Sequence, residues 1–253
     1  MTKTILITGA TSGFGKAAAF RFAKEKNNII ITGRREDRLK NLAGELQKEY
    51  GVKVLDLCFD VRDRYAVEHA LGSLPEEWKN IDVLVNNAGL AAGLSPFQDG
   101  SVDDWDQMID TNVKGLVYVT RMIAPGMVAR KSGHIINIGS IAGKETYPNG
   151  NVYCGSKHAV DSLTKAMRID MVPYGIKVTQ IAPGAAETEF SLVRFKWDEE
   201  KAASVYKGFQ PLQPEDVAEA IYYVTTLPAH VNINDLVIMP TAQASSMHFH
   251  KNL

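Results

Sequence analysis

The chain has 253 residues, of which 45% are hydrophobic and 23% charged, with 20 Gly and 10 Pro, a composition that excludes collagen-like, disordered and disulfide-scaffold proteins. The 28 Lys and Arg residues balance 29 Asp and Glu residues to a net charge of -1, so no basic excess exists for binding nucleic acid. No apolar run is long enough to span a membrane, and the run at 4–7 is too short for a signal peptide, so we expect a cytoplasmic protein without a membrane or nucleic-acid partner.

Short runs rich in Ile and Val predict the strands of the fold, in chain order at 4–8, 29–32, 52–59, 83–85, 134–138, 177–181 and 236–239. Most of them are apolar on successive residues, which is typical of strands covered on both faces. Helical spacing of apolar residues predicts helices between them, at 15–26, 36–50, 62–74, 102–130, 152–172 and 214–226. Because strand and helix alternate almost throughout, the sequence predicts an α/β fold with a doubly wound parallel sheet.

No stretch rich in Ser, Gly or Pro divides the chain, and the sequence contains no internal repeat. We therefore expect a single domain over residues 1–253. The least regular segment, 184–208, follows a predicted strand and carries mixed charges and aromatic residues. We expect it to form a substrate lid over the carboxyl ends of the strands, where open α/β sheets bind ligands.

The first predicted strand runs into a glycine-rich turn, Gly9-Ala10-Thr11-Ser12-Gly13-Phe14-Gly15, and a helix follows. Such a turn lets backbone N–H groups approach a pyrophosphate closely, and the helix N-terminus adds a favourable dipole. The alternative is a plain strand-to-helix turn that needs flexible residues. Because the turn joins the first strand to the first helix, we favour dinucleotide binding.

The second predicted strand ends in Gly33-Arg34-Arg35 rather than in an acidic residue. An Asp or Glu there would bind the ribose 2′-hydroxyl of NAD, whereas a guanidinium matches the 2′-phosphate of NADP. The sequence therefore favours NADP. Pairing of the two arginines with Glu36, Asp37 or solvent is the alternative.

The next two strand ends also carry residues that suit a nucleotide. Asp60 can make a polar contact to an adenine edge with Val61 beneath the ring, although capping of the following helix explains Asp60 equally well. In Asn86-Asn87-Ala88-Gly89, the amides can tie neighbouring strand ends together while the small residues leave room for a ribose. A simple turn is the alternative interpretation of this motif.

Tyr153 and Lys157 lie one helical turn apart, so both project from one face of the predicted helix. Because a cation favours a neighbouring phenolate, we expect Lys157 to lower the pKa of Tyr153 and make it a usable acid and base. Ser140, at the end of the fifth strand, is expected to bond the reacting oxygen, and Asn112 to hold a water or carbonyl connected to the lysine. Each residue alone has an ordinary structural explanation, but their coincidence points to chemistry.

Together these motifs resemble those of the standard short-chain dehydrogenases/reductases. The resemblance implies a seven-stranded Rossmann sheet, an oxidoreductase, a homotetramer and a catalytic tetrad of Asn112, Ser140, Tyr153 and Lys157. It also implies cofactor contacts from Gly9, Thr11, Ser12, Gly13, Phe14, Gly15, Arg34, Arg35, Asp60, Val61, Asn87, Ala88, Gly89, Tyr153, Lys157, Pro183, Gly184 and Thr188.

Longer blocks, at 74–82, 87–91, 133–140, 150–153 and 189–195, are similar to the NADP-dependent 3-hydroxy acid dehydrogenases of that family, the branch of serine and allo-threonine dehydrogenase or malonic semialdehyde reductase. Such a substrate carries a carboxylate that needs a cation once water is excluded. Arg194 is the first candidate for binding this carboxylate, and Lys144 is the second. We expect Ser140 and Tyr153 to bind the reacting end of the substrate. Either cation is alternatively an exposed charge of the lid.

Two other functions stay open: a carbonyl or 3-ketoacyl reductase of the same family, and a protein that binds NADPH without turnover. The intact Ser140, Tyr153 and Lys157 set argues against the second. His248 and His250 lack a carboxylate or cysteine partner, so we predict no metal and an exposed end or a subunit contact there. We expect Cys58 and Cys154 to be small buried thiols without a role.

Overall fold

A seven-stranded parallel sheet forms the centre of the molecule, with strand order β3-β2-β1-β4-β5-β6-β7. This computed structural model describes residues 2–252. The strands are β1 (Thr4–Ile7), β2 (Asn28–Gly33), β3 (Val54–Cys58), β4 (Val83–Asn86), β5 (His134–Ile138), β6 (Lys177–Pro183) and β7 (Asp235–Ile238). The predicted doubly wound α/β fold is therefore confirmed, and each predicted strand lies within two residues of an observed one.

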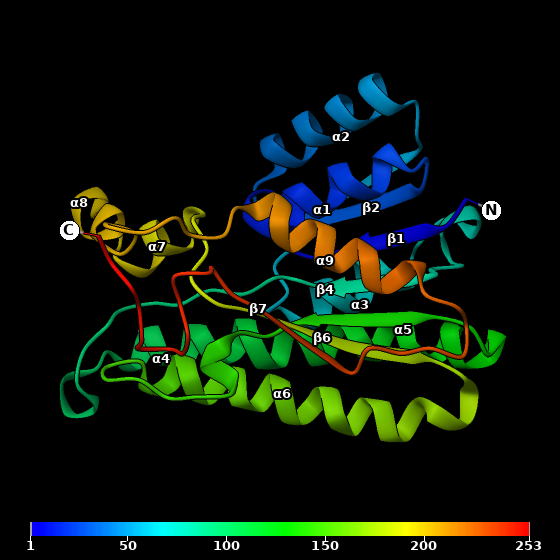
Figure 1. The fold of residues 1–253 in the computed structure, drawn as a ribbon. Helices are drawn as coiled ribbons and strands as arrows, with labels where there is room; N and C mark the ends of the chain where they lie inside the picture. The colour runs from blue at the N-terminus through cyan, green and yellow to red at the C-terminus, as the bar shows by residue number, and fades with distance from the viewer. Residues whose placement is uncertain (1, 253) are drawn as a thin grey trace.

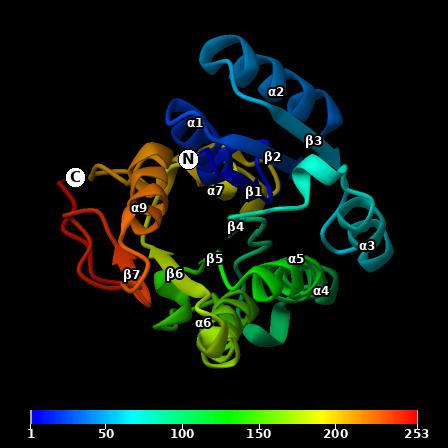
Figure 2. The same cartoon turned by 90° about the vertical axis from the view of Figure 1, so that its right-hand side faces the viewer.

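Helices cover both faces of the sheet (Figures 1 and 2). They are α1 (Gly13–Lys24), α2 (Glu36–Tyr50), α3 (Arg64–Gly72), α4 (Val102–Ile109), α5 (Leu116–Arg130), α6 (Asn151–Met171), α7 (Glu189–Arg194), α8 (Glu199–Ser204) and α9 (Pro214–Thr226). The helices α1, α2 and α9 pack on one face, and α3, α5 and α6 on the other. Within residues 2–252, no helix combines the length and the apolar character that a bilayer crossing requires.

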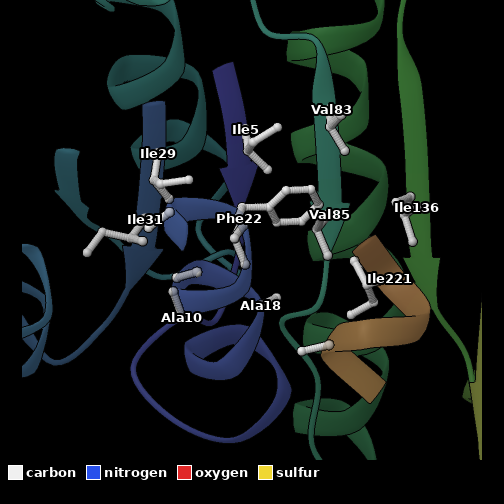
Figure 3. Packing of buried hydrophobic residues seen from close by; sticks show 14 of the residues in the cluster. Ile5, Ala10, Ala18, Phe22, Ile29, Ile31, Val83, Val85, Ile136 and Ile221 are labelled. Carbon is white, nitrogen blue, oxygen red and sulfur yellow. The ribbon is translucent and has the colours of Figure 1, made fainter. Parts of the chain in front are cut away.

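Successive apolar residues of the strands divide between the two layers. In β1, Ile5 and Ile7 face the layer of α1 and α9, whereas Leu6 faces the layer of α3 and α5. Figure 3 shows the Phe22 ring of α1 between Ile5 and Val85 on the first of these faces, with Ile221 of α9 on the far side of Val85. Because both faces of the central strands are buried, these strands are apolar on most successive residues, as the sequence indicated.

The structure differs from the sequence-based expectation at three places. The helix predicted at 102–130 contains a π-helical turn, Asp110–Gly115, between α4 and α5. Segment 184–208 holds two short helices, α7 and α8, that were not predicted. Cys58 is exposed rather than buried, because it ends β3 at the edge of the sheet, whereas Cys154 is buried as expected.

The strand order reverses between β1 and β4, where chain connections leave in opposite directions. In open α/β sheets, this arrangement opens a crevice outside the carboxyl ends of the strands. The glycine-rich turn after β1, the Asn87 motif after β4 and Ser140 after β5 all lie at this edge. The fold therefore brings together motifs that are far apart in the sequence.

Candidate active site

A cavity of about 810 Å³ lies at the carboxyl edge of the sheet. Segment 184–208 and residues near the C-terminus complete its walls. Nearly all the predicted site residues line it: Gly9, Thr11, Ser12, Gly13, Phe14, Arg34, Arg35, Asp60, Val61, Asn87, Ala88, Gly89, Ser140, Tyr153, Lys157, Pro183, Gly184, Thr188 and Arg194. Gly15 and Asn112 are not among the lining residues and lie behind the wall.

The glycine-rich turn is held against the end of β4 by the Asn87 side chain. Asn87 Nδ2 donates to the carbonyl oxygens of Thr8 and Gly9, at 2.8 and 3.1 Å. Gly9 has a φ of +66°, which favours glycine, and Gly15 is packed so tightly that an added Cβ would lie 2.5 Å from Asn87 Nδ2. Gly15 thus lets α1 begin close to the sheet, which leaves the N-terminus of α1 at the cavity.

The Arg35 guanidinium lies against the same turn. Its Nε donates to Thr11 Oγ1 at 3.1 Å, and its Nη2 donates to Thr11 Oγ1 at 2.8 Å and Ser12 Oγ at 3.0 Å. The Arg34 side chain is more exposed than that of Arg35, and its Nη1 lies 3.7 Å from Asp60 Oδ2. The cation and the two hydroxyls of Thr11 and Ser12 form one group that can bind a phosphate.

Asp60 lines the cavity but is bound to Arg62. Its Oδ1 accepts from the Arg62 backbone N–H at 3.0 Å, and its Oδ2 accepts from Arg62 Nη2 at 2.7 Å. The cap of α3 is instead Asp63, which accepts from the N–H groups of Tyr65 and Ala66. The alternative of Asp60 as the helix cap is therefore wrong.

Tyr153 and Lys157 project from α6 toward the cavity, and both are buried, with 8% and 6% of their surface exposed. Lys157 Nζ donates to the Ile138 carbonyl at the end of β5, at 2.9 Å. Ser140 Oγ accepts from the Ala142 N–H at 3.1 Å, and the hydroxyl lies near the Tyr153 phenol. Tyr153, Lys157 and Ser140 thus form one cluster of polar side chains at the end of β5.

The electrostatics of this cluster contradict one expectation. Burial raises the pKa of the Tyr153 phenol well above its ordinary value, and the effects of Ser140 and Arg194 only partly oppose this. Burial also lowers the pKa of Lys157 to about 8. The expectation that Lys157 lowers the pKa of Tyr153 is wrong in this structure, because the desolvation of the phenol dominates and the ammonium is bound to the Ile138 carbonyl.

Asn112 lies in the π-helical turn and bonds the backbone of the loop that follows β4. Its Oδ1 accepts from the Leu90 N–H and its Nδ2 donates to the Leu90 carbonyl, both at 2.8 Å, and Nδ2 also reaches Ser156 Oγ at 3.0 Å. A Cβ added to Gly89 would lie 3.2 Å from Asn112 Oδ1 and 3.5 Å from Lys157 Nζ. Asn112 therefore lies near the lysine, and the carbonyl that it holds is that of Leu90.

Arg194, the last residue of α7, points toward the cluster of Tyr153, Lys157 and Ser140. Its Cζ lies 5.5 Å from the Tyr147 ring centroid and 5.6 Å from that of Tyr153. Its Nε and Nη2 are buried, and within residues 2–252 neither has a hydrogen-bond partner. Lys144, the second candidate cation, is instead paired with Asp161 and Asp235 and does not line the cavity.

Sequence reasoning missed three parts of the wall. Tyr147 follows no motif, and Phe190 packs its ring edge to face with Tyr153, with centroids 5.5 Å apart. The tail also takes part: Phe249 lines the cavity and packs on Phe209 at 5.1 Å, so this end is not simply exposed. Figure 1 shows the tail reaching the neighbourhood of α8. Phe249, the one aromatic residue of the tail, was the only signal.

Comparisons with known proteins agree with this geometry. The family model described as short chain dehydrogenase matches residues 3–199. An NADP-dependent 3-hydroxy acid dehydrogenase from Salmonella typhi is 52% identical over 241 residues, which cover 95% of this chain and 96% of that protein. Sulfoacetaldehyde reductase 2 from Chromohalobacter salexigens is 50% identical and covers 97% of each chain. A solved structure of the closed form of serine dehydrogenase complexed with NADP+ shares 50% identity, with a TM-score of 0.92 over 98% of this chain and 100% of that one.

Proposed function

The chain belongs to the short-chain dehydrogenase family, and from this premise we propose that it is an NADP-dependent oxidoreductase acting on the CH–OH group of small 3-hydroxy acids such as serine, allo-threonine or 3-hydroxypropionate. The observation that carries the substrate assignment is the half-buried Arg194 side chain beside Tyr153, whose Nε and Nη2 have no hydrogen-bond partner within residues 2–252. Malonic semialdehyde would be the product from 3-hydroxypropionate.

The cavity residues fit a dinucleotide phosphate. Gly9 and Gly15 allow the turn and the start of α1 to approach a pyrophosphate, and neither position has space for a Cβ. Arg35 with the Thr11 and Ser12 hydroxyls offers a cation and two polar groups for a 2′-phosphate. When bound, NADP supplies the acceptor or donor of the hydride.

The chain's own residues would then handle the proton and the charge. In oxidation, the phenolate form of Tyr153 takes the proton of the substrate hydroxyl while Ser140 holds the developing carbonyl oxygen; because burial raises the pKa of Tyr153, the protonated phenol favours the opposite step, proton donation to that oxygen. Lys157, buried and one turn along α6, would hold the nicotinamide ribose when the cofactor is bound. Asn112 fixes the Leu90 backbone and thereby the loop beside Lys157. The reverse sequence reduces an aldehyde.

The substrate end favours an anion over a neutral group. Buried guanidinium nitrogens without a partner are costly, and Arg194 Nε and Nη2 have none within residues 2–252, so a carboxylate that accepts from both would stabilise both charges. A sulfonate would satisfy the same donors, and one relative, 50% identical, is a sulfoacetaldehyde reductase. Reduction of a sulfonate aldehyde is therefore the second candidate function.

A substrate panel tests the proposal. Initial rates would be measured with NADP and with NAD for L-serine, L-allo-threonine, 3-hydroxyisobutyrate, 3-hydroxypropionate, 2-hydroxyethanesulfonate and a 3-hydroxybutyryl thioester. We expect NADP-dependent turnover of small anionic alcohols and little turnover of the thioester. Preference for the thioester would favour a 3-ketoacyl reductase, and NADPH binding without turnover of any alcohol would favour a non-catalytic protein.

Three further assignments belong to this proposal. We propose that segment 184–208 is the substrate lid of a single domain, because α7 carries Phe190 and Arg194 to the cavity. We also propose a homotetramer, from likeness to the family, and a cytoplasmic location. Size-exclusion chromatography with light scattering tests the first of these two, and cell fractionation tests the second.

A further inference from the structure

The first residue of α7 is bound to the arginines that follow β2. Glu189 Oε2 accepts from Arg35 Nη1 at 2.8 Å, and Glu189 Oε1 accepts from Arg38 Nη1 at 2.6 Å. These contacts join residues far apart in the chain. The Glu189 carboxylate is about one-third exposed, so it lies at the mouth of the cavity rather than in bulk solvent.

The carboxylate completes the shell around Arg35. The other side of that guanidinium already donates to the Thr11 and Ser12 hydroxyls, as described above. A phosphate dianion bound by Arg35 and these hydroxyls would therefore lie next to Glu189. Two anions that share one guanidinium repel each other, and each weakens the binding of the other.

Its environment keeps the Glu189 carboxylate ionised. Burial would raise its pKa, but hydrogen bonds from Arg35 and Arg38 outweigh that effect and hold the pKa below its ordinary value. The side chain thus stays ionised at neutral pH. Arg38 offers Glu189 a second partner that does not contact the glycine-rich turn, so the carboxylate can leave Arg35 while α7 stays tethered.

We propose that Glu189 is a cofactor-specificity residue whose carboxylate competes with the 2′-phosphate of NADP for Arg35. This inference rests on the proposed NADP dependence. NADH lacks the 2′-phosphate, so its binding adds no second anion to the Arg35–Glu189 pair, whereas NADPH binding places a second anion on the guanidinium that Glu189 holds. Glu189 therefore reduces the preference for NADPH that Arg35 provides.

Cofactor binding by the purified protein tests the competition. Kd would be measured for NADPH and NADH by fluorescence titration, and for adenosine 2′,5′-bisphosphate by calorimetry, with no substrate present. We expect Glu189→Gln to tighten NADPH and the bisphosphate by about three- to tenfold and to leave NADH within about twofold. Glu187→Gln is the matched control, because it removes the same charge from an exposed carboxylate whose partner is Gln213.

The outcomes separate this inference from the proposed function. If the unmodified protein binds NADH as tightly as NADPH, the proposed NADP dependence is wrong. If it prefers NADPH but Glu189→Gln weakens NADPH binding or leaves it unchanged, then Glu189 orients Arg35 or is a bystander, and the competition is wrong. An equal effect of Glu187→Gln would reduce the result to overall charge and would equally overturn the inference.

Discussion

Replacement of Arg194 by Met tests the assignment of the substrate anion. The Met side chain keeps much of the apolar stem and removes the guanidinium, whose Nε and Nη2 are buried without partners in the described chain. A hydrogen bond to a charged group contributes about 1.5–3 kcal/mol, so two such bonds to a carboxylate give at least about 3 kcal/mol. We therefore expect kcat/KM for 3-hydroxypropionate to fall by roughly a hundredfold or more.

The assay compares this acid with 1,3-propanediol, in which a neutral hydroxymethyl group replaces the carboxylate. The diol should lose little, because it makes no ion pair with Arg194. Lys196→Met is the control, since this neighbouring cation is exposed and paired with Asp104. Equal losses for the acid and the diol would mean that Arg194 supports Tyr153 or the lid, and a change within about twofold for the acid would refute the carboxylate assignment.

Three further predictions concern catalysis, packing and pH. Tyr153→Phe should lower kcat by about 10²–10⁴-fold while leaving the Kd for NADPH within about twofold, and retained turnover would contradict the proton role. Gly15→Ala should lower the free energy of unfolding by about 1–3 kcal/mol, because the added Cβ would lie 2.5 Å from the Gly9 carbonyl oxygen. Gly44→Ala in α2 is the control and should not lower it, because the added Cβ would meet nothing within 4 Å. Chemical denaturation measures both free energies. Burial lowers the pKa of His134 to about 3, so the unfolded chain binds the extra proton below pH 6.5, and stability is lost as pH falls. Between pH 8 and pH 5, the titration of His134 should lower the free energy of unfolding by about 2 kcal/mol. Chemical denaturation of His134→Gln should show a fall in the free energy of unfolding that is smaller by this amount, and an unchanged pH dependence would contradict the prediction.

The strands and most cofactor motifs could be predicted because they depend on local rules. A strand buried on both faces is apolar on most successive residues, and a residue placed directly after a strand must lie at the carboxyl edge of the sheet. That logic brought Ser140 and Asn87 to one crevice from positions far apart in the chain. It needed only the strand ends, which the Ile and Val runs define well.

The missed features depend on which atoms a side chain meets after folding. Spacing placed Lys157 beside Tyr153, but it could not reveal that the ammonium bonds the Ile138 carbonyl or that the phenol is so deeply buried. For Asn112, the sequence predicted that the amide holds a water or a carbonyl near the lysine, but it could not reveal the π-helical turn or that the carbonyl is that of Leu90. Burial and hydrogen-bond partners are tertiary properties, so no periodicity encodes them.

The short helix α7 presents opposite charges at its two ends, and both ends line the cavity. Glu189 at its start contacts the arginine proposed to bind the cofactor phosphate, and Arg194 at its end lies near Tyr153. Six residues of helix span only about 8–9 Å, so both charged ends belong to one rigid piece. Opposite charges at the two ends mean that anions at the two sites act differently on α7: a cofactor phosphate repels its first residue, while a substrate anion attracts its last. Any displacement of Glu189 by the cofactor must therefore be absorbed by the Arg38 contact if Arg194 is to keep its place beside the reacting group.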